Sequence, residues 1–133
     1  METDLKAILK IKIENVSLEG ELMVPDKAKG LVIFSHGSGS SRFSPRNNFV
    51  AQLLQRKGLA TFLFDLMTPS EDEIYSLRFN IDLLSQRLVH VTQSLLKLPQ
   101  VKGLPLGYFG ASTGAASALI AASLLHNKIH AVV

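Results

Sequence analysis

Residues 106–114 read Leu-Gly-Tyr-Phe-Gly-Ala-Ser-Thr-Gly, and the architecture of the chain is inferred most directly from them. Its second half matches the pattern G-x-S-x-G from Gly110 to Gly114, between an apolar segment and a run of small residues that extends from Thr113 to His126. An apolar strand that turns at once into a helix predicts a tight, strained bend at Ser112. Glycine is expected at 110 and 114 because a side chain there would collide with the crossing strand and helix. The bend would hold the Ser112 hydroxyl exposed at the end of the sheet.

Ser112 is therefore the candidate nucleophile. A helix that begins at Thr113 directs unpaired N–H groups and the positive end of its dipole toward Ser112. Such groups stabilise the negative oxygen that forms when a nucleophile attacks a carbonyl. The predicted donors of this oxyanion hole are two backbone N–H groups, those of Thr113 and Ser38. Ser38 belongs to the loop His36-Gly37-Ser38-Gly39, which follows the apolar segment 31–34.

Short segments of strand character alternate with helical ones along the rest of the chain. The predicted strands are residues 5–13, 18–24, 31–34, 60–64, 104–109 and 129–133. The first two alternate apolar with polar residues, which predicts an antiparallel hairpin with one solvated face. Segment 31–34 is apolar at every residue, which is typical of a strand buried on both faces of a parallel sheet. The predicted fold class is therefore α/β, with a mainly parallel sheet led by an antiparallel hairpin.

Four helices are predicted between these strands. Ser44 and Pro45 are typical of an N-cap and a first helical residue, Thr68 to Glu71 has the spacing of a capping box, and an apolar stripe from Leu77 to Leu98 predicts the longest helix. The helix after Ser112 is expected to be buried on both sides. The large side chains expected to face inward are Phe49, Val50, Leu53 and Leu54 in the first helix and Leu119, Ile120, Leu124 and Leu125 in the last.

The hairpin, the strand leading into His-Gly-Ser-Gly and the strand leading into Gly-Ala-Ser-Thr-Gly together resemble the α/β-hydrolase fold, and within it the dienelactone hydrolase-like group. Residues 59–71 and 106–114 resemble a subgroup found alone or fused to phosphoribosyltransferase domains. The resemblance implies a serine-dependent hydrolase of small carboxylic esters or lactones that needs no cofactor or metal. Dienelactone hydrolases use a cysteine where this chain has Ser112, so their namesake reaction is not implied.

The resemblance also implies a catalytic acid and histidine on loops after later strands, in the order serine, acid, histidine. Residues 113–133 contain no Asp or Glu. We therefore expect residues 1–133 to form a partial domain, with strands 1 to 6 of the fold and without its last strands. Such a chain should be nearly inactive by itself. Its segment 129–133 should be an exposed edge strand, open to pairing with a second copy or with the missing half.

Four further polar residues flank the predicted site. His36 is expected to order its loop by hydrogen bonding rather than to act as a base. Asp65, at the end of segment 60–64, is expected either to accept nearby N–H groups or to orient a substrate. Arg42 and Arg46 flank the oxyanion loop, where they would either steer an anionic substrate or serve solubility.

The other histidines have structural interpretations. His126 is expected to cap its helix at the end that favours a cation, with Asn127 as the left-handed residue that stops it. His90 and His130 are expected to be structural or exposed.

Composition limits the function further. The formal net charge is +3, with basic and acidic residues interspersed, which does not favour a nucleic-acid partner. There is no cysteine, so disulfides and thiolate metal sites are excluded, as is typical of a cytoplasmic protein. The acidic start Met1-Glu2-Thr3-Asp4 is unlike a signal peptide, and no apolar stretch reaches the length of a membrane span.

Two other interpretations stay open on the sequence alone. Gly110 to Gly114 also resembles the glycine turn of short-chain dehydrogenases, which would bring Ser112 to a pyrophosphate. That turn should follow the first strand and be accompanied by a third glycine and a Tyr-x-x-x-Lys pattern, which are not found here. Alternatively, the chain is a truncated gene product or pseudoenzyme that only binds a ligand or partner at the hydrolase pocket.

Overall fold

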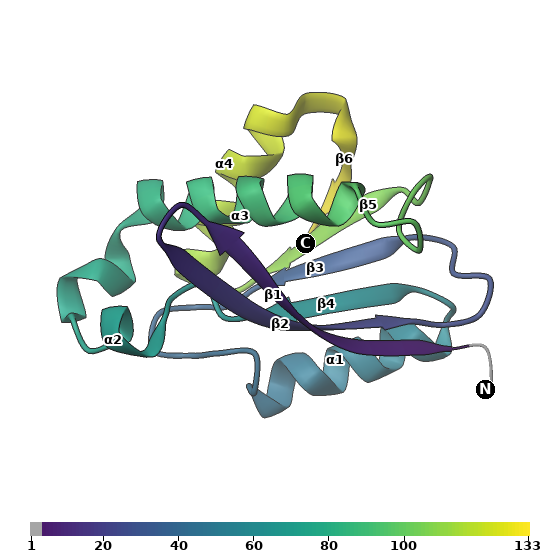
Figure 1. The fold of residues 1–133 in the computed structure, drawn as a ribbon, viewed down its shortest axis with the longest axis horizontal. Coiled ribbons are helices and arrows are strands. Elements are labelled where there is room, and N and C mark those ends of the chain that lie inside the picture. The colour runs from purple at the N-terminus through teal and green to yellow at the C-terminus, as the bar shows by residue number, and fades with distance from the viewer. Residues whose placement is uncertain (1–3) are drawn as a thin grey trace.

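The computed structural model describes residues 4–133, so Met1–Thr3, the start of the predicted domain and of the acidic N-terminus, lie outside the described residues. Six strands form one sheet in the order β1-β2-β4-β3-β5-β6 (Figure 1). The strands are β1 Leu5–Ile13, β2 Val16–Val24, β3 Leu31–Ser35, β4 Ala60–Phe64, β5 Leu106–Gly110 and β6 Ile129–Val132. The predicted α/β class is confirmed.

The sheet combines an antiparallel edge with a parallel centre. β1 pairs with β2 and β2 with β4 in antiparallel fashion, whereas β4, β3, β5 and β6 run parallel. β2 begins two residues earlier than predicted, because the ladder continues to the pair of Ile13 with Val16, next to a turn in which Glu14 has φ 52°. Within the described residues β6 pairs only with β5, so it lies at an edge of the sheet as predicted.

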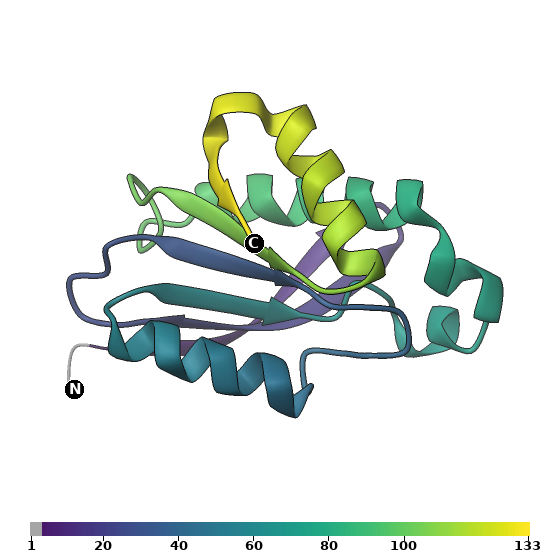
Figure 2. The same cartoon turned by 180° about the vertical axis from the view of Figure 1, so that it is seen from behind.

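Helices cover both faces of this sheet (Figures 1 and 2). They are α1 Pro45–Arg56, α2 Pro69–Asp72, α3 Ile81–Leu96 and α4 Thr113–Leu125, with short 3₁₀ turns η1 Tyr75–Phe79 and η2 His126–Lys128. α1 packs on one face against Phe34 and Leu63, while α3 and α4 contribute to the larger core on the other face. Parallel strands connected by helices on opposite faces bring the carboxyl ends of β3, β4 and β5 to the same edge.

The helix caps lie where the sequence predicts them, but one helix was predicted to be too long. The Ser44 side chain accepts from the Asn47 N–H, and Thr68 forms the predicted capping box with Glu71. The prediction of one helix from Leu77 was wrong at its start. η1 covers residues 75–79, and α3 begins at Ile81, because the Asn80 side chain caps it by accepting from the N–H of Leu83.

Two predicted helix faces were right only in part, since Val50, Leu54 and Leu125 pack in the cores as predicted. In α1, Phe49 is 62% exposed and Leu53 42%, because the small side chain of Ala51 faces the sheet instead. In α4, Leu119 and Leu124 are largely exposed and Ile120 is 39% exposed, so this helix is not buried on both sides. Its buried row is Gly114, Ser117, Ala118, Ala121 and Leu125. Small residues at this spacing let the helix axis lie close to its neighbours, and the larger side chains then point away.

The end of α4 also differs from the prediction. The residue with the left-handed backbone is His126, with φ 52°, rather than Asn127. The 3₁₀ turn that follows carries the chain into β6 at Ile129. His126, His90 and His130 are all exposed.

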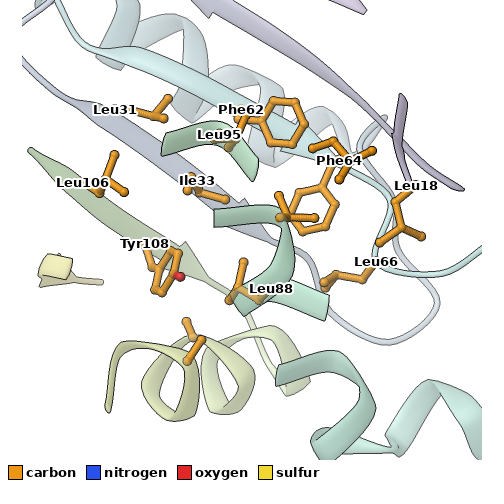
Figure 3. Close-up of a cluster of buried hydrophobic side chains, with 14 of the residues drawn as sticks. Leu18, Leu31, Ile33, Phe62, Phe64, Leu66, Leu88, Leu95, Leu106 and Tyr108 are labelled. Carbon is orange, nitrogen blue, oxygen red and sulfur yellow. The ribbon is translucent and has the colours of Figure 1, made fainter. Parts of the chain in front are cut away.

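The larger core lies between the sheet and helices α3 and α4 (Figure 3). The rings of Phe62 and Phe64 stack with centroids 5.4 Å apart. The buried Tyr108 hydroxyl lies 2.6 Å from the Thr92 hydroxyl, which itself donates to the Leu88 carbonyl, so Tyr108 is the donor to Thr92. Burial raises the pKa of Tyr108 to about 12. The apolar stripe of α3 therefore serves core packing, as predicted, with one polar pair inside it.

Candidate active site

The bend predicted at Ser112 is present between β5 and α4. Ser112 has φ 56° and ψ −124°, a backbone conformation that L-residues adopt only under strain. A Cβ on Gly110 would lie 2.7 Å from the Ala115 Cα, and a Cβ on Gly114 would lie 2.0 Å from the Ser35 carbonyl oxygen. Both glycines are therefore required by space, since neither has a positive φ. The result is an exposed serine that is held by the packing on either side of it.

The loop after β3 lies directly against this serine. A Cβ on Gly37 would be 3.2 Å from the Ser112 Cβ and 3.0 Å from the Ala111 carbonyl oxygen, so glycine allows this close approach without any shift of the neighbouring atoms. The Ser38 N–H, one of the two predicted oxyanion donors, donates to Thr113 Oγ1 at 2.9 Å. The Thr113 N–H, the other predicted donor, has no acceptor within residues 4–133. Both predicted donors thus lie beside Ser112, and their roles stay predictions.

His36 orders this loop, as its sequence context predicts. The buried ring accepts the Leu66 N–H at Nε2, 3.0 Å away, so Nδ1 carries the proton and donates to the Gly37 carbonyl at 2.9 Å. Burial lowers the pKa of His36, which keeps the ring neutral and its Nε2 lone pair available. With both nitrogens occupied by backbone groups, this histidine is a scaffold between the ends of β3 and β4.

Asp65 accepts hydrogen bonds from one arginine, through that residue's backbone and its side chain. It accepts from the Arg42 N–H at 2.8 Å and from Arg42 Nη1 at 2.6 Å. Arg42 pairs with Glu19 as well and lies over the Phe43 ring, so its side chain is only 14% exposed. Of the two open interpretations, this geometry favours the acceptor role of Asp65 and gives Arg42 a structural role, whereas Arg46 is exposed.

An ion pair between the buried Arg87 and the partly exposed Glu71, which sequence reasoning missed, fixes the loop after β4. Arg87 of α3 makes a two-pronged contact with Glu71, with Nη2 2.6 Å from Oε2, and it also donates to the Leu66 carbonyl at 3.0 Å. These hydrogen bonds hold the pKa of the Glu71 carboxyl below its usual range. The signal in the sequence is an arginine on the apolar stripe of α3, between Leu84 and Leu88, where a charge needs a partner.

Two hollows flank the loop beside Ser112. One, of about 460 Å³, is lined in part by Gly37, Ala111 and Arg46. The other, of about 220 Å³, is lined in part by His36, Phe43 and Asp65.

The structure brings the loop 36–38 and the bend 110–114 together and leaves the remaining histidines elsewhere. Across residues 4–133, no histidine or carboxylate side chain is hydrogen-bonded to Ser112. The described part of the chain also contains no cluster of three or more side chains suited to a metal ion. None of its helices is both long and apolar enough to cross a membrane.

Comparisons with known proteins agree with this geometry. A solved structure of dienelactone hydrolase from Anabaena variabilis superposes with a TM-score of 0.91 and 47% identity, over 97% of this chain and 62% of that one. The esterase Est1E from Butyrivibrio proteoclasticus superposes with a TM-score of 0.75 over 94% of this chain and 48% of its own, at 19% identity, which shows the fold alone.

Two curated Mycobacterium tuberculosis proteins, both named "putative phosphoribosyl transferase", are 51% identical over 118 residues. The match covers 89% of this chain and 27% of theirs, so that name describes proteins of which this chain spans about a quarter. A scan against models of protein families finds no match. Together with the bend at Ser112, the superpositions show that the chain has an α/β-hydrolase-like fold, with a marked similarity to the solved dienelactone hydrolase, of which it spans less than two thirds.

Proposed function

We propose that this chain carries the nucleophile and oxyanion hole of a serine hydrolase for small carboxylic esters or lactones. The observation that carries the proposal is Ser112, a strained and exposed serine with a glycine loop packed against its Cβ. Strain at an exposed polar residue is characteristic of functional sites. The strand order and the hydrolase neighbours favour this function over dinucleotide binding.

In the proposed reaction Ser112 Oγ attacks the substrate carbonyl carbon, and the π electron pair moves onto the carbonyl oxygen. The N-terminus of α4 stabilises that charge. The serine proton must pass to a base. His36 is not a candidate, because its Nε2 is occupied by the Leu66 N–H and its Nδ1 faces Gly37. A serine without a base reacts slowly, so we expect the activity of residues 1–133 to be weak.

Covalent labelling tests the proposal. A fluorophosphonate in excess should add one phosphonyl group to the purified protein over hours, measured by intact mass, as the P–O bond to Ser112 forms and fluoride leaves. Ser112→Ala should abolish the addition. Ser123→Ala is the matched control, because Ser123 is an exposed serine in α4 away from the bend.

Hydrolysis of p-nitrophenyl acetate gives a second readout. We expect slow, saturable release of nitrophenol that depends on Ser112. Equal labelling and equal turnover in the unaltered protein and in Ser112→Ala would contradict a serine hydrolase and favour a protein that only binds ligands.

A further inference from the structure

The predicted oxyanion donor Ser38 N–H is already occupied. It donates to the Thr113 hydroxyl oxygen, 2.9 Å away, so its proton is not directed at a substrate. A hydroxyl that accepts one hydrogen bond still has its own proton to donate. Among the described residues that proton has no acceptor, since Ser117 contacts the Thr113 carbonyl rather than its hydroxyl.

The peptide between Gly37 and Ser38 is held at both ends. Its carbonyl accepts from His36 Nδ1 at 2.9 Å and from the Ser40 N–H at 3.1 Å, while its N–H is bound to Thr113. Turning the Ser38 N–H toward a substrate would break contacts on both sides of one rigid peptide plane. The Ser38 N–H is therefore held in the direction of Thr113 Oγ1.

Thr113 also lies where an oxyanion would form. It follows Ser112 directly and begins α4, so its unpartnered N–H is at the positive end of the helix. Its hydroxyl is tied to the loop whose Gly37 packs against the Ser112 Cβ. The hydroxyl proton and the N–H of the same residue are thus both available beside the nucleophile.

We propose that the Thr113 hydroxyl is itself an oxyanion donor, and that the Ser38 N–H acts through it rather than on the substrate. This inference rests on the proposed hydrolase function. When Ser112 Oγ bonds to a carbonyl carbon or to phosphorus, the oxygen that gains the electron pair accepts the Thr113 O–H and N–H. The serine proton leaves to water or to a buffer base. Donation from Ser38 polarises the hydroxyl and strengthens the bond that it gives.

The rate of fluorophosphonate labelling, measured over a range of probe concentrations, tests the inference. Thr113→Val keeps the shape of the side chain and removes the hydroxyl. We expect it to lower the limiting labelling rate by about 10²-fold, the effect of losing one oxyanion donor, with little change in the concentration for half-maximal rate. Thr113→Ser should restore most of the lost rate. If the valine variant does not fold, Thr113→Ala also removes the hydroxyl, and its labelling rate is compared with that of Thr113→Ser instead.

Hydrogen exchange of the Ser38 amide, followed by NMR, gives a second readout that does not depend on the labelling reaction. In Thr113→Val the Ser38 amide should lose protection from hydrogen exchange, and Thr113→Ser should regain it. If a folded Thr113→Val protein is labelled at the original rate or faster, the inference about Thr113 is wrong while the proposed hydrolase function stands. The hydroxyl would then be dispensable, or would block Ser38. No labelling of the unaltered protein would refute the proposed function, and this inference with it.

Discussion

Replacing Gly114 with alanine sets local propensity against tertiary packing. Gly114 is the second residue of α4, where alanine is favoured over glycine by about 1 kcal/mol in an isolated helix. In the fold, however, the new Cβ would lie 2.0 Å from the Ser35 carbonyl oxygen and 2.5 Å from that of His36. Both obstacles are backbone atoms, so no side chain can rotate to make room.

The size of the effect follows from these distances. To reach a separation of 3.0 Å, below which real Cβ contacts are essentially never found, α4 and the end of β3 must part by about 1 Å. Overpacking that shifts backbone costs about 3 kcal/mol, the upper end of the usual range. After the gain in helix propensity, Gly114→Ala should lower the free energy of unfolding by about 2 kcal/mol or more.

Urea unfolding followed by circular dichroism measures this change. Gly107→Ala in β5 is the matched control, because its Cβ would meet nothing closer than 3.4 Å, and its stability should stay within about 0.5 kcal/mol of the original. Gly114→Ala should also react more slowly with fluorophosphonate, since the bend at Ser112 must open to accommodate the new side chain. A Gly114→Ala protein as stable as the original, or more stable, would refute the steric account of the bend.

Two further predictions concern buried polar groups. Thr92→Val should lower the free energy of unfolding by about 1–3 kcal/mol, because it leaves the buried Tyr108 hydroxyl unpaired. Adding Tyr108→Phe to that variant should recover part of the loss. If the two substitutions have strictly additive effects in urea unfolding, the pairing is contradicted. Burial lowers the pKa of His36 below 6.5, so the unfolded chain binds the proton more readily, and urea-unfolding free energies should be highest well above pH 6.5 and fall as the pH drops below it. The loss of stability at low pH should be smaller in His36→Asn. A loss of the same size in that variant would mean that groups other than His36 cause it.

Much of the site was predictable because its determinants are local. The strand, the two glycines and the small-residue helix are contiguous, so the bend at Ser112 follows from steric rules on a few residues. The buried Arg87 was harder to interpret. Its partner Glu71 lies 16 residues away in a separate helix, and its position on an apolar stripe signals only that some partner is needed.

The residues alone predict the alternation of strands and helices, the antiparallel hairpin and the turn that exposes Ser112, because hydrophobic period, capping and glycine sterics act over a few residues. Three-dimensional packing, in contrast, determines that Phe49 and Leu119 face outward and that the Ser38 N–H donates to Thr113. Those outcomes depend on which segments, distant in the chain, come within a few ångströms of each other, and no local pattern encodes that distance.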